Sequence, residues 1–151
     1  MTIELIMSTR VVTVDMDDSL EVVHELFKKV KFHHLLVMDE GELAGIISDR
    51  DLFKSISPYV QTLSELPRDA ATLKKKAHLI MTRHPIVVDV GVSLVDAITL
   101  FVAKGISCLP VLNKDKKVVG IITTKDILRM FVQNPSVVAG FEKALNQFDK
   151  L

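Results

Sequence analysis

The sequence predicts an α+β fold in which two β-α-β-β-α repeats pack into one pseudo-symmetric module. The first observation is a stretch that occurs twice, at residues 45–51 and 120–126: a glycine, two isoleucines, a hydroxyl residue and, three positions after it, an aspartate. The second observation is the register of the copies, because like residues such as Met7 and Met81 lie 74 positions apart before this stretch and 75 positions apart within it. A single inserted residue explains the difference, so we expect two copies of one folding unit.

The first repeat has the pattern strand, helix, strand, strand and helix. A β-branched run precedes an acidic turn, and Ser19 is a suitable N-cap for a helix whose apolar residues recur at helical spacing. Two apolar runs around Gly41 predict a hairpin, and Ser48 is expected to cap a last helix that ends before Pro58. The predicted elements are residues 11–14, 20–30, 35–38, 43–47 and 49–56.

The second repeat follows the same order, with Ser93 as the helix cap and Gly105 as the helix stop. Its predicted elements are residues 86–88, 94–104, 109–112, 118–122 and 127–132. Between the repeats, Asp69 to Leu73 predict a helical connector that ends near His78. After Pro135, apolar residues at helical spacing predict an amphipathic tail; they are Val137, Val138, Phe141, Ala144, Leu145 and Phe148. The domain boundaries are therefore 7–57, 58–79, 80–133 and 134–151.

Composition limits the classes of function. The chain has 151 residues, of which 48% are hydrophobic, and its 19 basic residues equal its 19 acidic residues. A chain with no net charge has no overall field that attracts nucleic acid or a membrane surface, so we expect neither partner. Cys108 is the single cysteine, which excludes an internal disulfide, and the sequence shows no signal peptide and no apolar run long enough to span a membrane. We expect a cytoplasmic protein.

The repeated hydroxyl and acid residues permit two interpretations. Ser48 with Asp51, and Thr123 with Asp126, have the spacing of capping boxes, in which each side chain bonds the backbone N–H of the other residue. The same acids could instead accept hydrogen bonds from a ligand, and the two roles can coexist. The spacing alone does not separate them.

The repeat order, the boxes and the run Leu109-Pro110-Val111 together resemble a tandem pair of CBS domains, from Met7 to Phe131. The first copy departs from the pattern, because Leu36 stands where the second copy has Pro110. The resemblance implies a disc-like module with two clefts that bind adenosine-containing ligands, here AMP, ADP, ATP or S-adenosylmethionine. It also implies that modules form homodimers.

The resemblance assigns ligand-binding roles to residues in both repeats. The two acids would accept from ribose hydroxyls, the two box hydroxyls would contact ribose or phosphate, and the cations before the acids would meet phosphate. Backbone segments near the start of each repeat would line adenine, and the residues just before each middle strand would approach phosphate. The expected site residues are Thr9, Val11, Val12, His33, His34, Ser48, Arg50, Asp51, His84, Pro85, Ile86, Ile106, Ser107, Thr123, Lys125 and Asp126.

Two further kinds of site find little support. The neighbours His33 and His34 would point to opposite faces of a strand and have no third ligand nearby, so we expect no metal site. No serine, histidine and aspartate order, paired-carboxylate site or glycine-lysine phosphate loop is visible, so we expect no enzyme. We therefore expect a regulatory module that senses an adenosyl compound and acts on its own assembly or on an unidentified protein partner. The alternative is a ligand-free dimerisation or adaptor module.

Overall fold

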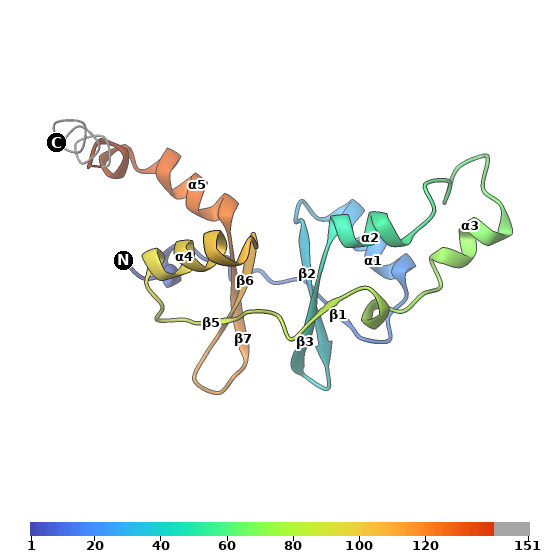
Figure 1. Ribbon diagram of the computed structural model, residues 1–151, viewed down its shortest axis with the longest axis horizontal. Coiled ribbons are helices and arrows are strands. Elements are labelled where there is room, and N and C mark those ends of the chain that lie inside the picture. Colours follow the sequence, from blue (N-terminus) through green and yellow to red (C-terminus); the bar gives the residue numbers. More distant parts are fainter. Residues whose placement is uncertain (141–151) are drawn as a thin grey trace.

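The computed structural model of the chain describes residues 1–140 and contains two β-sheets (Figure 1). One sheet has four strands in the order β1-β2-β3-β4, and the other has three strands in the order β5-β6-β7. In both sheets the first strand pairs in parallel with the second, which pairs antiparallel with the third. The predicted α+β fold with two repeats is confirmed.

The first repeat forms the predicted elements with small changes at their ends. They are β1 (Thr13–Asp15), α1 (Leu20–Lys29), β2 (His34–Asp39), β3 (Glu42–Ser48) and α2 (Asp49–Ser55). The hydroxyl of Ser19 accepts a hydrogen bond from the N–H of Val22, as expected of an N-cap. The hairpin turns at Glu40 and Gly41, whose φ angles of 46° and 82° are both positive, which is the backbone that tight hairpins require.

The second repeat repeats this order. Its elements are β5 (Val88–Asp89), α4 (Leu94–Lys104), β6 (Cys108–Leu112), β7 (Val118–Thr123) and α5 (Thr124–Gln133). Ser93 caps α4 by accepting from the N–H of Asp96, and Gly105 ends the helix in a left-handed conformation with φ of 61°. Figure 1 shows α4 and α5 beside the second sheet, while α1 and α2 lie beside the first.

The connector is less helical than expected. Its helix α3 spans Pro67–Thr72, and a separate 3-10 turn follows at Ala77–Leu79, so the predicted continuation to His78 is wrong. The chain leaves the helix because its backbone bonds α1 instead: the N–H groups of Leu20 and Glu21 donate to carbonyls of the connector at 2.8 and 3.0 Å. The connector therefore packs on the first repeat.

Two segments that the sequence did not predict cross between the repeats. The short strand β4 (Thr82–Arg83), which leads into the second repeat, pairs with β3 of the first. The amino-terminal segment makes the opposite crossing, because Ile3 is fully buried in the second core and Ser8 bridges Ile121 of β7. The segment that precedes the first repeat therefore packs on the second repeat, and the segment that precedes the second repeat packs on the first.

Each sheet supports its own hydrophobic core. The first core joins β1 to β3 with α1, α2 and the connector, and its fully buried members include Leu20, Val23, Leu35, Val37, Ile47 and Leu52. The second core joins the other sheet with α4, α5 and the amino-terminal segment, and includes Ile3, Ala97, Leu109, Val111 and Ile122. Because each repeat has its own core, space remains at the junction between the repeats, and a cavity lies there.

The predicted tail is described only in part. Residues 135–140 are helical, and Val137 and Val138 are half-buried. Phe141, Ala144, Leu145 and Phe148, on which the amphipathic pattern depends, lie outside the described residues. The tail's role therefore stays a prediction.

Candidate ligand-binding site

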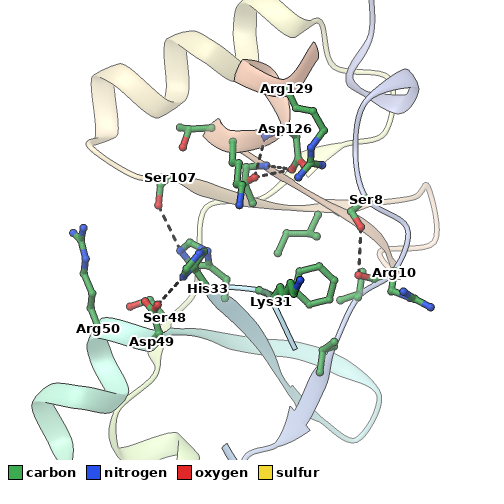
Figure 2. Close-up of a pocket in the computed structure, with 18 of the residues that line it drawn as sticks. Ser8, Arg10, Lys31, His33, Ser48, Asp49, Arg50, Ser107, Asp126 and Arg129 are labelled. Atoms are coloured by element: carbon green, nitrogen blue, oxygen red, sulfur yellow. Dashed lines mark hydrogen bonds and ion pairs between the residues drawn. The ribbon is translucent and has the colours of Figure 1, made fainter. Parts of the chain in front are cut away.

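A cavity of about 830 Å³ lies between the two repeats (Figure 2). Its walls come from the amino-terminal segment, from the start of β2, from the start of α2 and from the junction of β7 with α5. Among the residues expected to bind a ligand, ten line it: Val11, Val12, His33, His34, Ser48, Arg50, Ser107, Thr123, Lys125 and Asp126. The cavity thus combines side chains that the sequence assigned to different repeats, and its volume is in the range of small-molecule sites.

The crossing of the amino-terminal segment builds one wall. The N–H and carbonyl groups of Ser8 and Ile121 exchange two hydrogen bonds of 2.9 Å. The residues that follow, Arg10 to Val12, line the cavity. Gly120 permits this approach, because a Cβ atom there would lie 3.0 Å from the carbonyl oxygen of Ser8. The glycine of the repeated motif therefore serves the packing of two segments.

Asp126 stands at the start of α5, in a complete capping box. Its Oδ2 accepts from the N–H of Thr123 at 2.8 Å and from the hydroxyl of Thr123 at 2.7 Å, and its own N–H donates back to that hydroxyl at 3.3 Å. Its Oδ1 accepts from Arg129 at 3.2 Å. The capping interpretation is confirmed, and the carboxylate still forms part of the cavity wall.

The cavity carries an excess of positive charge although the whole chain is neutral. Arg10, Lys31, Arg50 and Lys125 line it, and within residues 1–140 no hydrogen bond or ion pair joins any of their side chains to another group. The two lining carboxylates, on Asp49 and Asp126, already have cationic or polar partners. Unpaired cations around a concave surface attract an anion, and the N-terminus of the ten-residue helix α5 adds partial positive charge.

The two histidines at the start of β2 differ from each other. Nδ1 of His33 lies 2.7 Å from Oδ2 of Asp49, and this bond and the nearby charge lower the pKa of Asp49 although burial opposes its ionisation. Nε2 of His34 lies 3.5 Å from the hydroxyl of Ser107, and burial lowers the pKa of His34. His34 therefore links the first repeat to the second as a neutral ring at pH 7.

The other expected residues do not line this cavity. They are Thr9, Asp51, His84, Pro85, Ile86 and Ile106. Asp51 is engaged in its own capping box, where its Oδ2 accepts from the N–H and the hydroxyl of Ser48 at 2.8 and 2.9 Å. His84 follows β4 on the edge of the first sheet, the pseudo-symmetric counterpart of Arg10. A second cleft around these residues stays a prediction.

The structure also adds lining residues that the sequence analysis did not select. They are Ser8, Arg10, Lys31, Phe32, Asp49, Phe53, Ile121, Thr124 and Arg129. Arg129 could have been found, because it lies one helical turn after Asp126 and can reach its carboxylate. No sequence pattern indicates Phe53 or Lys31, since their positions at the cavity depend on how the two repeats meet.

Two absences concern the described residues. Between residues 1 and 140, no group of three histidine, cysteine, aspartate or glutamate side chains is arranged to hold a metal ion. In the same part of the chain, every helix is too short or too polar to cross a bilayer.

The comparisons with known proteins agree with this architecture. The CBS domain family model matches residues 3–58 and 77–133. A CBS domain-containing protein of Dictyostelium discoideum is 29% identical over 133 residues, which cover 87% of this chain and 91% of that protein.

Solved structures give the same result. CBSX2 of Arabidopsis thaliana, in complex with AMP, has a TM-score of 0.71 at 29% identity, and the alignment covers 87% of this chain and 96% of that one. The CBS domain pair of protein MJ0100, in complex with 5-methylthioadenosine and S-adenosyl-L-methionine, has a TM-score of 0.71 at 28% identity and covers 87% and 99%. With two in-register repeats, two matching sheets and a family model that spans both, this chain belongs to the CBS domain family.

Proposed function

We propose that this protein is a regulatory module that binds an adenine nucleotide or a related adenosyl compound in the cavity between its repeats. The observation that carries the proposal is the placement of the Asp126 carboxylate in one cavity with four cationic side chains that have no partner among residues 1–140. A carboxylate can accept from the two hydroxyls of a ribose, and the cations can hold the attached phosphate. The AMP complex of a 29% identical family member supports this choice of ligand class.

The roles within the site follow the same chemistry. Asp126 would bind the ribose, Thr123 and Lys125 would contact phosphate together with Arg50, and the segment around Val11 and Val12 would line the adenine. The box at Asp126 can cap α5 and bind ribose together, because a carboxylate has about four acceptor positions and the box uses two of them. Arg129 occupies one more, so ribose binding would compete with or displace its hydrogen bond.

A thermal-shift screen tests the proposal with AMP, ADP, ATP and S-adenosylmethionine, and with GMP as the matched control for the base. A ligand present at 100 times its dissociation constant should stabilise the folded chain by about 2.7 kcal/mol. For a chain of this length the melting temperature should rise by roughly 5–10 °C. If no adenosyl compound raises the melting temperature at the highest concentration tested, the ligand-free adaptor function replaces the proposal.

The alternative function has an observation of its own. Apolar side chains on α4 and α5 remain exposed, with exposed fractions of 70% for Val95, 79% for Val102, 65% for Leu128 and 81% for Val132. Such a face suits an interface between two copies, so we also propose a homodimer. Sedimentation analysis should show a dimer that Val102→Asp dissociates, whereas a monomeric wild-type chain would contradict this assembly.

A further inference from the structure

A second cavity, of about 380 Å³, adjoins the first on the side of α1 and α2. Six residues line both cavities: Lys31, Phe32, His33, Asp49, Phe53 and Lys125. The two spaces therefore meet at a shared wall, and a ligand that fills the first cavity can continue into the second.

The second cavity has an aromatic wall that ribose and phosphate binding does not require. Phe27 of α1, Phe32 before β2 and Phe53 of α2 line it, together with Val30. Phe53 is 62% exposed and Phe32 is 36% exposed, which is unusual for side chains of this size when nothing covers them. Three phenylalanines on one concave surface suit a flat, apolar group.

The shared wall suits a diphosphate. Lys31 and Lys125 have no side-chain partner within residues 1–140, and the nearby carboxylate of Asp49 is held by His33. On the far side, Lys28 is already bound to Glu25 and Gln61, so it offers less to a ligand than the two free lysines. Anion-binding groups thus stand between the Asp126 cavity and the aromatic wall.

One polar group beside the aromatic wall also lacks a partner. Nδ1 of His24, a residue that lines the second cavity, is buried and makes no hydrogen bond to any described residue. Burial and the charge of Lys28 lower the pKa of His24, so the ring is neutral at pH 7. Apart from the Asp49 carboxylate, which is paired with His33, the lining is apolar and cationic with a neutral imidazole, and it disfavours a positively charged ring.

We propose that the ligand is an adenosine diphosphate that carries a second, uncharged ring, and that this ring lies against Phe53 in the second cavity. The inference rests on the proposed function, because the adenosine half of the ligand occupies the site at Asp126. It extends that function by assigning the ring to the aromatic wall and the diphosphate to Lys31 and Lys125. An unsubstituted nucleotide would leave Phe27, which lines only the second cavity, uncovered.

Isothermal titration of the full chain with ADP, ADP-ribose and NADH tests the inference. ADP-ribose contains the adenosine, the diphosphate and the second ribose of NADH but lacks its uncharged dihydronicotinamide ring. We expect NADH to bind about fivefold more tightly than ADP-ribose, which is the usual contribution of one aromatic contact. Phe53→Ala should remove this preference, so that NADH and ADP-ribose bind the variant with equal affinity.

Leu128→Ala is the matched control, because Leu128 occupies the position of Phe53 in the second repeat, is 65% exposed and does not line either cavity. This variant should keep the preference for NADH. Equal affinities of the wild-type chain for NADH and ADP-ribose would overturn the inference while ADP binding upheld the proposed function. If ADP and the other adenosyl compounds of the thermal-shift screen fail to bind as well, both proposals fall.

The competing occupant of the aromatic wall is a second copy of the chain. Sedimentation of wild type and Phe53→Ala should give the same oligomeric state if the wall binds a ligand. If Phe53→Ala dissociates a dimer and NADH shows no preference, the wall belongs to an interface and the ligand assignment is wrong.

Discussion

The two capping boxes have nearly the same internal geometry but different surroundings. In both, the aspartate Oδ2 accepts from the cap N–H at 2.8 Å and from the cap hydroxyl, at 2.9 Å for Ser48 and 2.7 Å for Thr123. Asp126, however, lines the large cavity, while Asp51 does not. A capping box therefore explains why a helix begins at each place, while the neighbouring segment decides which box faces the cavity.

The neighbouring segments differ in how closely they pack. In the first sheet, β4 pairs with β3 over two residues, and Arg83 of β4 lies opposite Gly45. In the second sheet, a single bridge between Ser8 and Ile121 makes the equivalent crossing, and the following residues line the cavity. The looser crossing is the one beside the candidate site.

The largest expected effect separates the two crossings. A Cβ atom at Gly45 would lie 2.6 Å from Sδ of Met81 and 2.8 Å from the carbonyl oxygen of Thr82, so backbone must move. At Gly120 the nearest atom, Sδ of Met7 at 2.9 Å, belongs to a flexible side chain, and the backbone carbonyl oxygen of Ser8 lies at 3.0 Å, a contact that a shift of a few tenths of an ångström relieves. We expect Gly45→Ala to lower the free energy of unfolding by about 3 kcal/mol and Gly120→Ala by about 1 kcal/mol.

Urea denaturation of the ligand-free variants measures both losses. Equal losses of the free energy of unfolding would show that the two crossings pack equally tightly and would contradict this prediction.

The second prediction compares the two acids. Glutamate at this position of a capping box also bonds the cap N–H, so Asp126→Glu and Asp51→Glu should both keep near wild-type stability. The extra methylene moves the carboxylate away from a ribose, so Asp126→Glu should weaken AMP binding about tenfold, the usual scale for a hydrogen bond to a charged group. Asp51→Glu should change AMP affinity less than twofold.

Titration calorimetry at one pH provides the comparison, with urea denaturation as the check on folding. A greater loss for Asp51→Glu would move the working site to the second cleft.

The third prediction concerns Arg50 and Lys125, which occupy equivalent positions in the two repeats yet line the same cavity. Each exposed cation should add a modest, salt-dependent attraction to phosphate. We expect Arg50→Gln and Lys125→Gln each to weaken ADP binding about threefold at low salt, with the affinity for adenosine unchanged. An Arg50→Gln variant with wild-type ADP affinity would show that each repeat's cation serves only its own cleft.

Much of the fold could be predicted, because the repeat and its local signals act within each unit. Ser19, Ser48 and Ser93 cap helices, and Gly105 ends one, as their residue types indicate. The segments at Ile3–Leu5 and Thr82–Arg83 could not be predicted, since each forms backbone hydrogen bonds to the other repeat. No local periodicity records such a contact.

The lining of the cavity was predictable to the same extent. The resemblance indicated Asp126, Thr123 and Lys125, which lie together at the start of one helix. It also indicated Asp51 and Ile106 as site residues, and these two do not line the cavity. Arg50 lines the same cavity as the box of the other repeat, a placement that depends on how the repeats pack and that no local pattern indicates.

The smallest expected effect is a difference in titration between the starts of β2 and β6. His34 occupies the position of Cys108 in the second repeat; Cys108 is buried and His34 is half-buried. Burial and the charge of His33 lower the pKa of His34, with Asp49 and Asp51 acting in the opposite direction. Burial raises the pKa of the Cys108 thiol, which therefore stays neutral between pH 5 and pH 8.

The sign of the pH effect follows from the lowered pKa of His34. Between that value and about 6.5, the pKa of an unfolded histidine, the unfolded chain binds a proton at this position that the folded chain does not. The free energy of unfolding should therefore fall as the pH drops below about 6.5, and His34→Gln should make the profile flatter. His24, whose pKa burial also lowers, should leave a residual slope that His24→Gln removes. Urea denaturation from pH 7.5 to pH 5.5 measures the profiles, and superimposable profiles for wild type and His34→Gln would show that the two strand starts do not differ in this way.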